Sequence, residues 1–307
     1  MSDKPQSKTF TFKRVEVTVT PTNWKLIEWY LDPLFRFQTN DLKFYVEWAR
    51  AAGEWTRINP DEPIVNECMF VDQDSYRCST RNDIFYRVVV DDGIQEYNSK
   101  PESTLGILNQ REWLLARDII RKEYLRLLKY VGARGYLLKR RHYGPRCPTC
   151  IDHDVEEPVT SQCTSCFGTG YLGGYYNGLL YYLDLSGTTT SEDVKTPFGT
   201  VDNKQRTARC VAYPRIDSYD IWVDATRNKR HVLRKITTAV EMRGQPLVYV
   251  IEDMRELPAS RIEYQIPLQQ DVVPIGACTS STASSCTPNN VTSNTGWRRG
   301  ISAQDVW

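Results

Sequence analysis

The chain has 307 residues, 40% of them apolar, and its 39 Lys and Arg nearly balance its 38 Asp and Glu. The net charge of the chain is therefore too small to drive binding to nucleic acid or membranes by itself. The sequence contains no run of about 18 apolar residues, the length needed to span a bilayer. The polar start, MSDKPQSKTFTF, lacks the apolar stretch of a secretory signal peptide. We therefore expect no membrane partner and a cytoplasmic setting in which thiols stay reduced.

Residues 1–104 are predicted to form a β-sandwich. Strand-length runs follow one another at about ten-residue spacing, separated by turn signals. The run TFKRVEVTVT places Val15, Val17 and Val19 on one face, as in a strand with one buried side. Several short strands at such spacing are typical of a sandwich.

Two stretches of this region, KFYVEWARAAGEWTRI and DIFYRVVVDDGIQEYNSKP, resemble the C and F–G strands of a fibronectin type III domain. The resemblance implies that Trp24 or Trp29 is the core tryptophan and that Tyr86 is the strand-F tyrosine. Cys68 and Cys78 lie in the same region. In a cytosolic chain we expect buried free thiols there, with a disulfide as the alternative.

Residues 105–178 are predicted to hold a helix followed by a zinc-binding segment. In NQREWLLARDIIRKEYLRLLKYV, Asn109 can cap the helix and Glu112 completes a capping box. Gly132 and Gly135 are expected to end it. Apolar residues recur at the three-four spacing of one helix face, namely Trp113, Ala116, Ile120, Tyr124, Leu127 and Val131.

The charge of this segment is one-sided. Residues 111–146 contain eleven Lys and Arg but only three acidic residues, a local excess of about +8. One interpretation is a solvated helix face. The other is a basic surface that faces DNA or a partner protein, formed by Arg117, Arg121, Lys139, Arg140, Arg141 and Arg146.

Four of the nine cysteines form two Cys-x-x-Cys pairs, Cys147 with Cys150 and Cys163 with Cys166. Each pair can turn both sulfurs towards one metal, and four thiolates complete a tetrahedral, structural Zn²⁺ site. A redox dithiol and two disulfides are the alternatives. The glycines of CFGTG allow a tight turn whose amides approach the sulfurs. This element resembles the Cys-x-x-Cys-x-Gly-x-Gly repeats of the DnaJ-type chaperone zinc domain.

Residues 179–270 are predicted to form a small β-barrel. Alternating runs such as RTARCVAYPRI and RIEYQIPL are separated by turn signals. In YYNGLLYYLDLS, Asn177-Gly178 is expected to be the turn of a hairpin. Residues 271–307 are rich in Ser, Thr and Asn and are predicted to be an extended tail. No role is assigned to the remaining cysteines, Cys68, Cys78, Cys210, Cys278 and Cys286.

The barrel region resembles the β-barrel half of tailed-bacteriophage neck proteins. The matching positions are Asp220, Trp222, Arg230, His231, Val232, Gly244, Pro246, Leu257, Pro258, Tyr264 and Ile266. The resemblance implies a structural virion protein, assembled in the host cytoplasm as a ring of the head–tail connector. The implied ring has six or twelve copies, contacts the portal or adaptor protein and the tail terminator or tube proteins, and surrounds packaged DNA.

An enzyme is not expected. The chain has three histidines, His142, His153 and His231, and lacks the G-x-S-x-G, H-E-x-x-H and G-x-x-x-x-G-K-[ST] motifs. Two alternatives to the neck protein remain. One is a zinc-ribbon nucleic-acid-binding protein, and the other is a phage module that attaches fibres or capsid.

Overall fold

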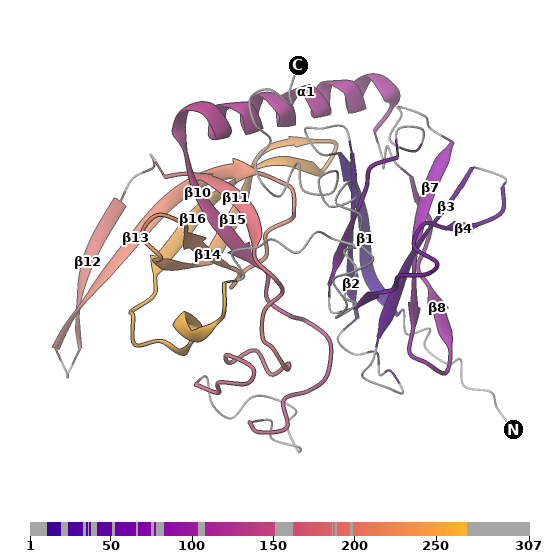
Figure 1. Cartoon of the computed structure of the whole chain (residues 1–307). Coiled ribbons are helices and arrows are strands. Elements are labelled where there is room, and N and C mark those ends of the chain that lie inside the picture. Colours follow the sequence, from indigo (N-terminus) through magenta and orange to yellow (C-terminus); the bar gives the residue numbers. More distant parts are fainter. Residues whose placement is uncertain are drawn as a thin grey trace, which may run out of the picture.

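The computed structural model describes residues 11–19, 24–32, 35, 37, 42–50, 53–65, 67–74, 77, 83–103, 108–150, 162–185, 187, 189–196 and 199–268. This part of the chain is mostly β, with an amino-terminal sandwich, one long helix and a carboxy-terminal barrel (Figure 1). The predicted fold class is therefore confirmed. The predicted tail, 271–307, lies outside the described residues, as do Cys78, Cys278 and Cys286.

The sandwich consists of two antiparallel sheets. The first contains β1 (Phe12–Val19), β2 (Lys25–Leu31) and β6 (Met69–Asp72), in the order β1-β2-β6. The second has the order β4-β3-β7-β8, built from β4 (Thr56–Arg57), β3 (Lys43–Arg50), β7 (Ile84–Asp91) and β8 (Glu96–Asn98). Two short strands pair with it, β5 (Ile64–Val65) with β3 and β9 (Glu102–Ser103) with β7. The stretches compared with strands C, F and G thus lie side by side in one sheet.

The sandwich core is built from the inward faces of both sheets. Trp29 is fully buried, and its ring centroid lies 5.3 Å from that of Phe44, whereas Trp24 is only partly buried. Tyr86 is also fully buried, and its hydroxyl donates to Asp72 over 2.7 Å. Cys68 is a buried free thiol, as expected, and burial raises its pKa to about 12.

The helix α1 (Gln110–Arg126) continues into one π-helical turn, η1 (Leu127–Val131). Its capping box is confirmed, because the Asn109 side chain accepts from the Glu112 amide over 2.9 Å and Glu112 accepts from the Asn109 amide over 3.0 Å. All the predicted face residues are buried except Val131, which is 43% exposed. The helical segment ends before Gly132, as predicted, but Gly135 lies inside the next strand.

The barrel contains six strands. In sequence order they are β10 (Gly132–Leu138), β11 (Leu179–Asp184), β13 (Gly199–Val211), β14 (Ile221–Asp224), β15 (Arg230–Met242) and β16 (Gln245–Glu256). Around the barrel the order is β11-β10-β14-β15-β16-β13, and pairing of β13 with β11 closes it. β12 (Thr189–Thr196) pairs with β13, and the hairpin that they form extends away from the barrel (Figure 1). A short 3-10 helix, η2 (Ile262–Gln265), follows β16.

Two sequence predictions about the barrel are wrong. The barrel begins at Gly132 rather than at residue 179, so the cysteine segment connects two neighbouring barrel strands. Asn177-Gly178 is not a hairpin turn, because the strand that follows it, β11, pairs with β10 across that long connection. Gly135 serves this arrangement, since a Cβ there would lie 2.3 Å from the indole of Trp222 in the barrel interior.

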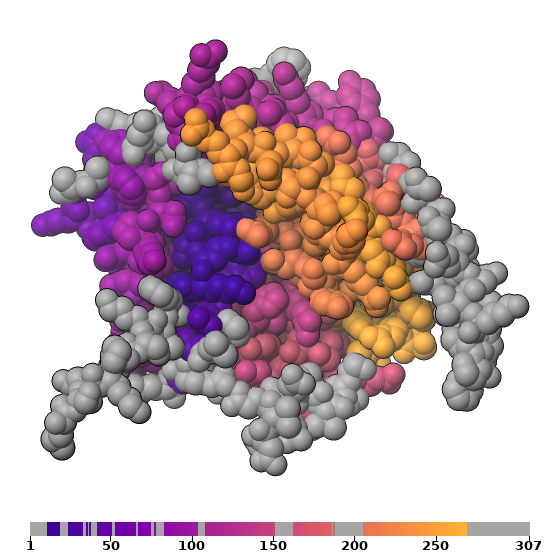
Figure 2. Space-filling model, turned by 180° about the vertical axis from the view of Figure 1, so that it is seen from behind, coloured from indigo at the N-terminus to yellow at the C-terminus, as the bar shows by residue number. Residues whose placement is uncertain are grey.

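The sandwich, the helix and the barrel share one apolar core. Helix α1 lies along one side of both halves (Figure 1), and Arg209 in the barrel bridges to Glu123 on the helix over 2.8 Å. On the opposite view, sandwich and barrel surfaces meet directly (Figure 2). Between them lies a buried ion pair, in which Lys139 Nζ is 3.4 Å from Glu28 Oε1. Lys139 is therefore not a surface residue, contrary to the sequence prediction.

Candidate metal centre

A two-stranded ribbon leads from the barrel to the paired cysteines. We call residues 139–150 and 162–176, which continue β10 and β11 past the barrel, the metal ribbon. Its two strands are joined by backbone hydrogen bonds: Tyr176 N–H to Lys139 O (2.9 Å), Arg141 N–H to Gly174 O (3.0 Å), Leu172 N–H to Pro145 O (2.9 Å) and Cys147 N–H to Gly170 O (3.0 Å). The pairing of β10 with β11, continued along the ribbon, thus places the first cysteine pair next to the second.

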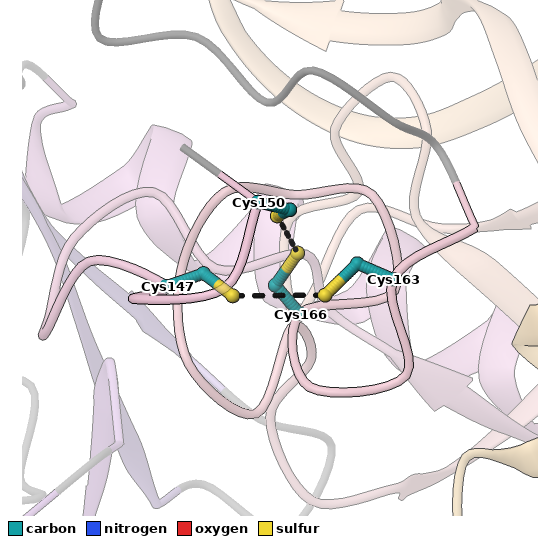
Figure 3. Close-up of side chains that lie close together, drawn as sticks. All are labelled: Cys147, Cys150, Cys163 and Cys166. Carbon is teal, nitrogen blue, oxygen red and sulfur yellow. Dashed lines mark hydrogen bonds between the residues drawn. The ribbon is translucent and has the colours of Figure 1, made fainter. Parts of the chain in front are cut away.

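The four cysteine sulfurs converge on one point (Figure 3). The Sγ atoms of Cys147 and Cys163 are 3.7 Å apart, those of Cys150 and Cys166 are 3.1 Å apart, and all four lie within 4.8 Å of one another. A Zn–S bond of about 2.3 Å gives tetrahedral sulfur–sulfur separations of about 3.8 Å. The buried group therefore has the size and donor set to hold a metal ion.

The two predicted alternatives fit this geometry less well. All four thiols are free, and the distances of 3.1 and 3.7 Å far exceed a disulfide bond of about 2.05 Å. The closest approaches join one cysteine of each pair, Cys147 with Cys163 and Cys150 with Cys166. A Cys-x-x-Cys redox dithiol would instead work within one pair.

The second knuckle is shaped by residues with left-handed backbone. Phe167, Gly168 and Gly170 have φ values of 50°, 76° and 82°. This path lets the amide of Phe167 donate to Cys163 O over 2.8 Å, and that of Thr169 to Cys166 O over 3.0 Å. The amides of Gly168 and Gly170 approach the sulfur of Cys166, as the sequence predicted.

The same backbone amides favour a thiolate. Burial opposes ionisation of Cys163, but the amides of Ser165 and Cys166 and the neighbouring thiols stabilise its anion and lower its pKa to about 6. By contrast, burial and hydrogen bonds to the other cysteines raise the pKa of Cys150. One sulfur is thus ready to bind a cation, whose charge would in turn ionise the others.

The predicted basic residues do not form one surface. Arg117 and Arg121 lie on α1, on the opposite side of the molecule from the metal ribbon (Figure 1), and Lys139 is buried. On the ribbon, three guanidinium groups each lie over a tyrosine ring: Arg140 over Tyr219 at 5.8 Å, Arg141 over Tyr176 at 4.8 Å and Arg146 over Tyr171 at 4.6 Å. In the sequence, the one signal for these contacts is that Tyr171 and Tyr176 follow the second cysteine pair.

The centre is suited to a structural role. Four cysteines fill a tetrahedral site and leave no coordination position for a substrate.

Burial lowers the pKa of His142 to about 4 and also lowers that of His231, so neither described histidine is charged at neutral pH. His153 lies outside the described residues.

No protein-family model matches the sequence, and no curated protein is significantly similar to it. Across the described ranges, no helix combines the length and apolar character needed to cross a membrane. The geometry of the chain and the resemblances in its sequence are therefore the basis for its function.

Proposed function

We propose that this chain is a structural protein of a tailed-phage virion, a ring component of the neck that joins the portal to the tail. The observation that carries the proposal is a closed barrel that shares one core with a sandwich and is extended by a four-cysteine ribbon. This architecture offers several rigid outer surfaces for neighbouring chains. It also concentrates the cysteines in a site closed to substrates.

The positions that resemble phage neck proteins support the proposal because they build the barrel. Trp222 is fully buried, and Asp220 accepts the backbone amides of Arg140 over 2.8 Å and of Asp217 over 2.9 Å. Arg230 donates to the backbone oxygens of Glu263 and Ile266 and so holds η2 against the barrel. The resemblance thus involves fold-determining residues.

The metal in this proposal is Zn²⁺. A buried set of four thiolates selects zinc or an iron–sulfur centre, and two Cys-x-x-Cys knuckles are the usual ligands of structural zinc. Zinc would hold the cysteine ends of the ribbon together, where few apolar residues are available to do so.

Exposed apolar side chains support contacts with other copies. Leu115 on α1 is 52% exposed, and Tyr130 in η1 is 82% exposed. Large apolar side chains left in water are typical of protein contact surfaces. In the proposed ring of six or twelve copies, these residues would meet a neighbouring subunit, the portal or adaptor protein, or the tail terminator or tube proteins.

Imaging of purified virions with symmetry resolved tests the assembly. The proposal requires several copies arranged around one vertex, between portal and tail, with packaged DNA passing through the lumen. Copies found on fibres or on the capsid would favour an attachment module. Absence from virions would contradict both phage roles.

A nucleic-acid-binding zinc ribbon is the second candidate. The arginines of the metal ribbon, Arg140, Arg141 and Arg146, favour it, because each lies over a tyrosine ring and the ribbon that carries them leads to the cysteine centre. Phosphate contacts make binding fall steeply with salt. Salt-sensitive retention of the purified protein on DNA, lost in the Arg146→Gln variant, would favour this candidate.

A further inference from the structure

A cavity of about 320 Å³ lies where the sandwich, the metal ribbon and a barrel loop meet. Its lining includes Lys13 and Arg14 from β1, Arg140 and Arg141 from the ribbon, and Asp217 from the loop between β13 and β14. Its volume is at the lower end of the range for small-ligand sites, about 300–1,000 Å³. The cavity is therefore sized for a small group.

The charge of the lining is strongly positive. Four cationic side chains surround the cavity, and Asp217 is the single carboxylate among the residues that line it. His142, also in the lining, is neutral at pH 7 because burial lowers its pKa to about 4. The lining therefore carries a formal excess of three positive charges, which favours an anion.

Asp217 offsets only part of this excess, because its carboxylate also faces the Tyr30 hydroxyl and the buried cation Lys139. It accepts a hydrogen bond from the Tyr30 hydroxyl, lies 3.7 Å from Lys139 Nζ and lies 3.8 Å from an Nη atom of Arg14. Lys139, a buried cation beside the cavity, lies between this carboxylate and that of Glu28.

Two of the arginines are held in place by the fold. The guanidinium of Arg14 lies 4.0 Å from the centroid of the Tyr30 ring, and that of Arg141 lies 4.8 Å from that of Tyr176. Arg141 Nε also donates to Tyr175 O over 3.3 Å. Planar guanidinium groups that are fixed in this way lose little conformational entropy on binding, and they match the oxygen pairs of phosphate.

We propose that this cavity binds a phosphate group, with Lys13, Arg14, Arg140 and Arg141 as its cationic partners. The group can belong to inorganic phosphate or a small phosphomonoester, or it can be a phosphodiester of nucleic acid. The site goes beyond the proposed structural role and does not depend on ring formation.

Calorimetric titration of the full-length protein with inorganic phosphate tests the proposal. The Lys13→Gln/Arg140→Gln variant should bind phosphate at least about tenfold more weakly, because hydrogen bonds from charged donors are lost. Asp217→Asn should bind more tightly, because the one opposing charge is removed. The matched control is Arg111→Gln/Lys122→Gln, which removes two exposed cations from α1, on the opposite side of the molecule from the metal ribbon (Figure 1), and should bind like the wild type.

Thermal unfolding of each variant shows whether it is folded before its affinity is interpreted. Absence of saturable phosphate binding to the wild-type protein would overturn the proposal. Equal affinity of the wild-type, cavity-variant and control proteins would also overturn it.

The source of the phosphate is decided with a short oligonucleotide carrying a fluorophore. Displacement of the oligonucleotide by inorganic phosphate, together with weaker oligonucleotide binding by the cavity variant, would identify a nucleic-acid phosphodiester. Phosphate binding without oligonucleotide binding would identify a small phosphate ligand.

Discussion

Removing the buried cation Lys139 should sharply destabilise the contact between sandwich and barrel. Lys139 Nζ lies 3.4 Å from Glu28 Oε1 and also donates to the backbone oxygen of Arg215, while the Arg215 amide donates to both oxygens of Glu28 at 3.2 and 3.1 Å. Both charged side chains are almost fully buried. In Lys139→Met, Glu28 would keep its burial and lose its cation.

The expected cost is about 3–5 kcal/mol of unfolding free energy, the range measured when one member of a buried pair is removed. The cost should depend on pH. Burial raises the pKa of Glu28, whereas Lys139 and the Arg215 amide oppose that rise. Without Lys139 the pKa rises further, so the folded variant takes up a proton. A carboxyl whose pKa is higher in the folded than in the unfolded state loses its stabilising effect as pH rises. The pKa of Glu28 in the unfolded chain is the same in both proteins, so the deficit of the variant should grow once the pH passes the folded-state pKa of Glu28 in the wild-type protein, which burial already raises.

Urea unfolding at pH 5 and pH 8 measures both effects. The double variant Lys139→Met/Glu28→Met should recover most of the loss, since replacing a whole buried pair by apolar groups is close to neutral. The control Lys122→Met, at an exposed position on α1, should change stability by less than about 0.5 kcal/mol. A loss below about 1 kcal/mol at pH 8, or no recovery in the double variant, would refute the reasoning.

Three further predictions concern the metal centre, the helix and a buried carboxylate. Elemental analysis of the purified protein should find close to one zinc per chain. The Cys147→Ser/Cys163→Ser variant should lose the metal and should melt at a lower temperature in calorimetry. A variant that kept both its metal and its melting temperature would contradict the site. Asn109→Ala should cost about 1 kcal/mol in urea unfolding through loss of the capping box, and Asn109→Gly much less; equal losses would argue against a side-chain cap. Burial raises the pKa of Asp220 to about 7, above about 3.9 in the unfolded chain, so its contribution to stability should fall as pH rises from about 4 to 7. Asp220→Asn should remove that slope from the pH profile of unfolding, and an unchanged profile would count against it.

Several features could be predicted because their signals are local. The capping box of Asn109 and Glu112 involves residues three apart, and the glycines after Cys166 are needed where the chain takes positive φ. The paired spacing of the cysteines brings two ligands into one knuckle, whatever the rest of the fold does. The sandwich also followed from the alternating pattern of its strands, which a buried face imposes.

Other features depended on partners far away in the sequence. Lys139 looked like part of an exposed basic run, but it is buried as the ion-pair partner of Glu28, which is 111 residues away in the sequence. Gly135 looked like a helix terminator, but its missing side chain makes room for Trp222 on the neighbouring barrel strand, β14. Asn177-Gly178 carried a hairpin signal, yet the strand that follows it pairs with β10, on the far side of the cysteine segment.

By itself, the sequence determined the β-rich class, the helix with its cap and the four cysteines of the candidate metal centre, because periodicity, capping and ligand spacing act within a few residues. The tertiary structure decided where the barrel begins, which cations are buried and which line a cavity. The physical reason is that barrel closure, charge pairing and burial are set by neighbours in space. The cavity between β1, the ribbon and the loop that carries Asp217 unites residues more than 200 positions apart, and only the folded chain brings them together.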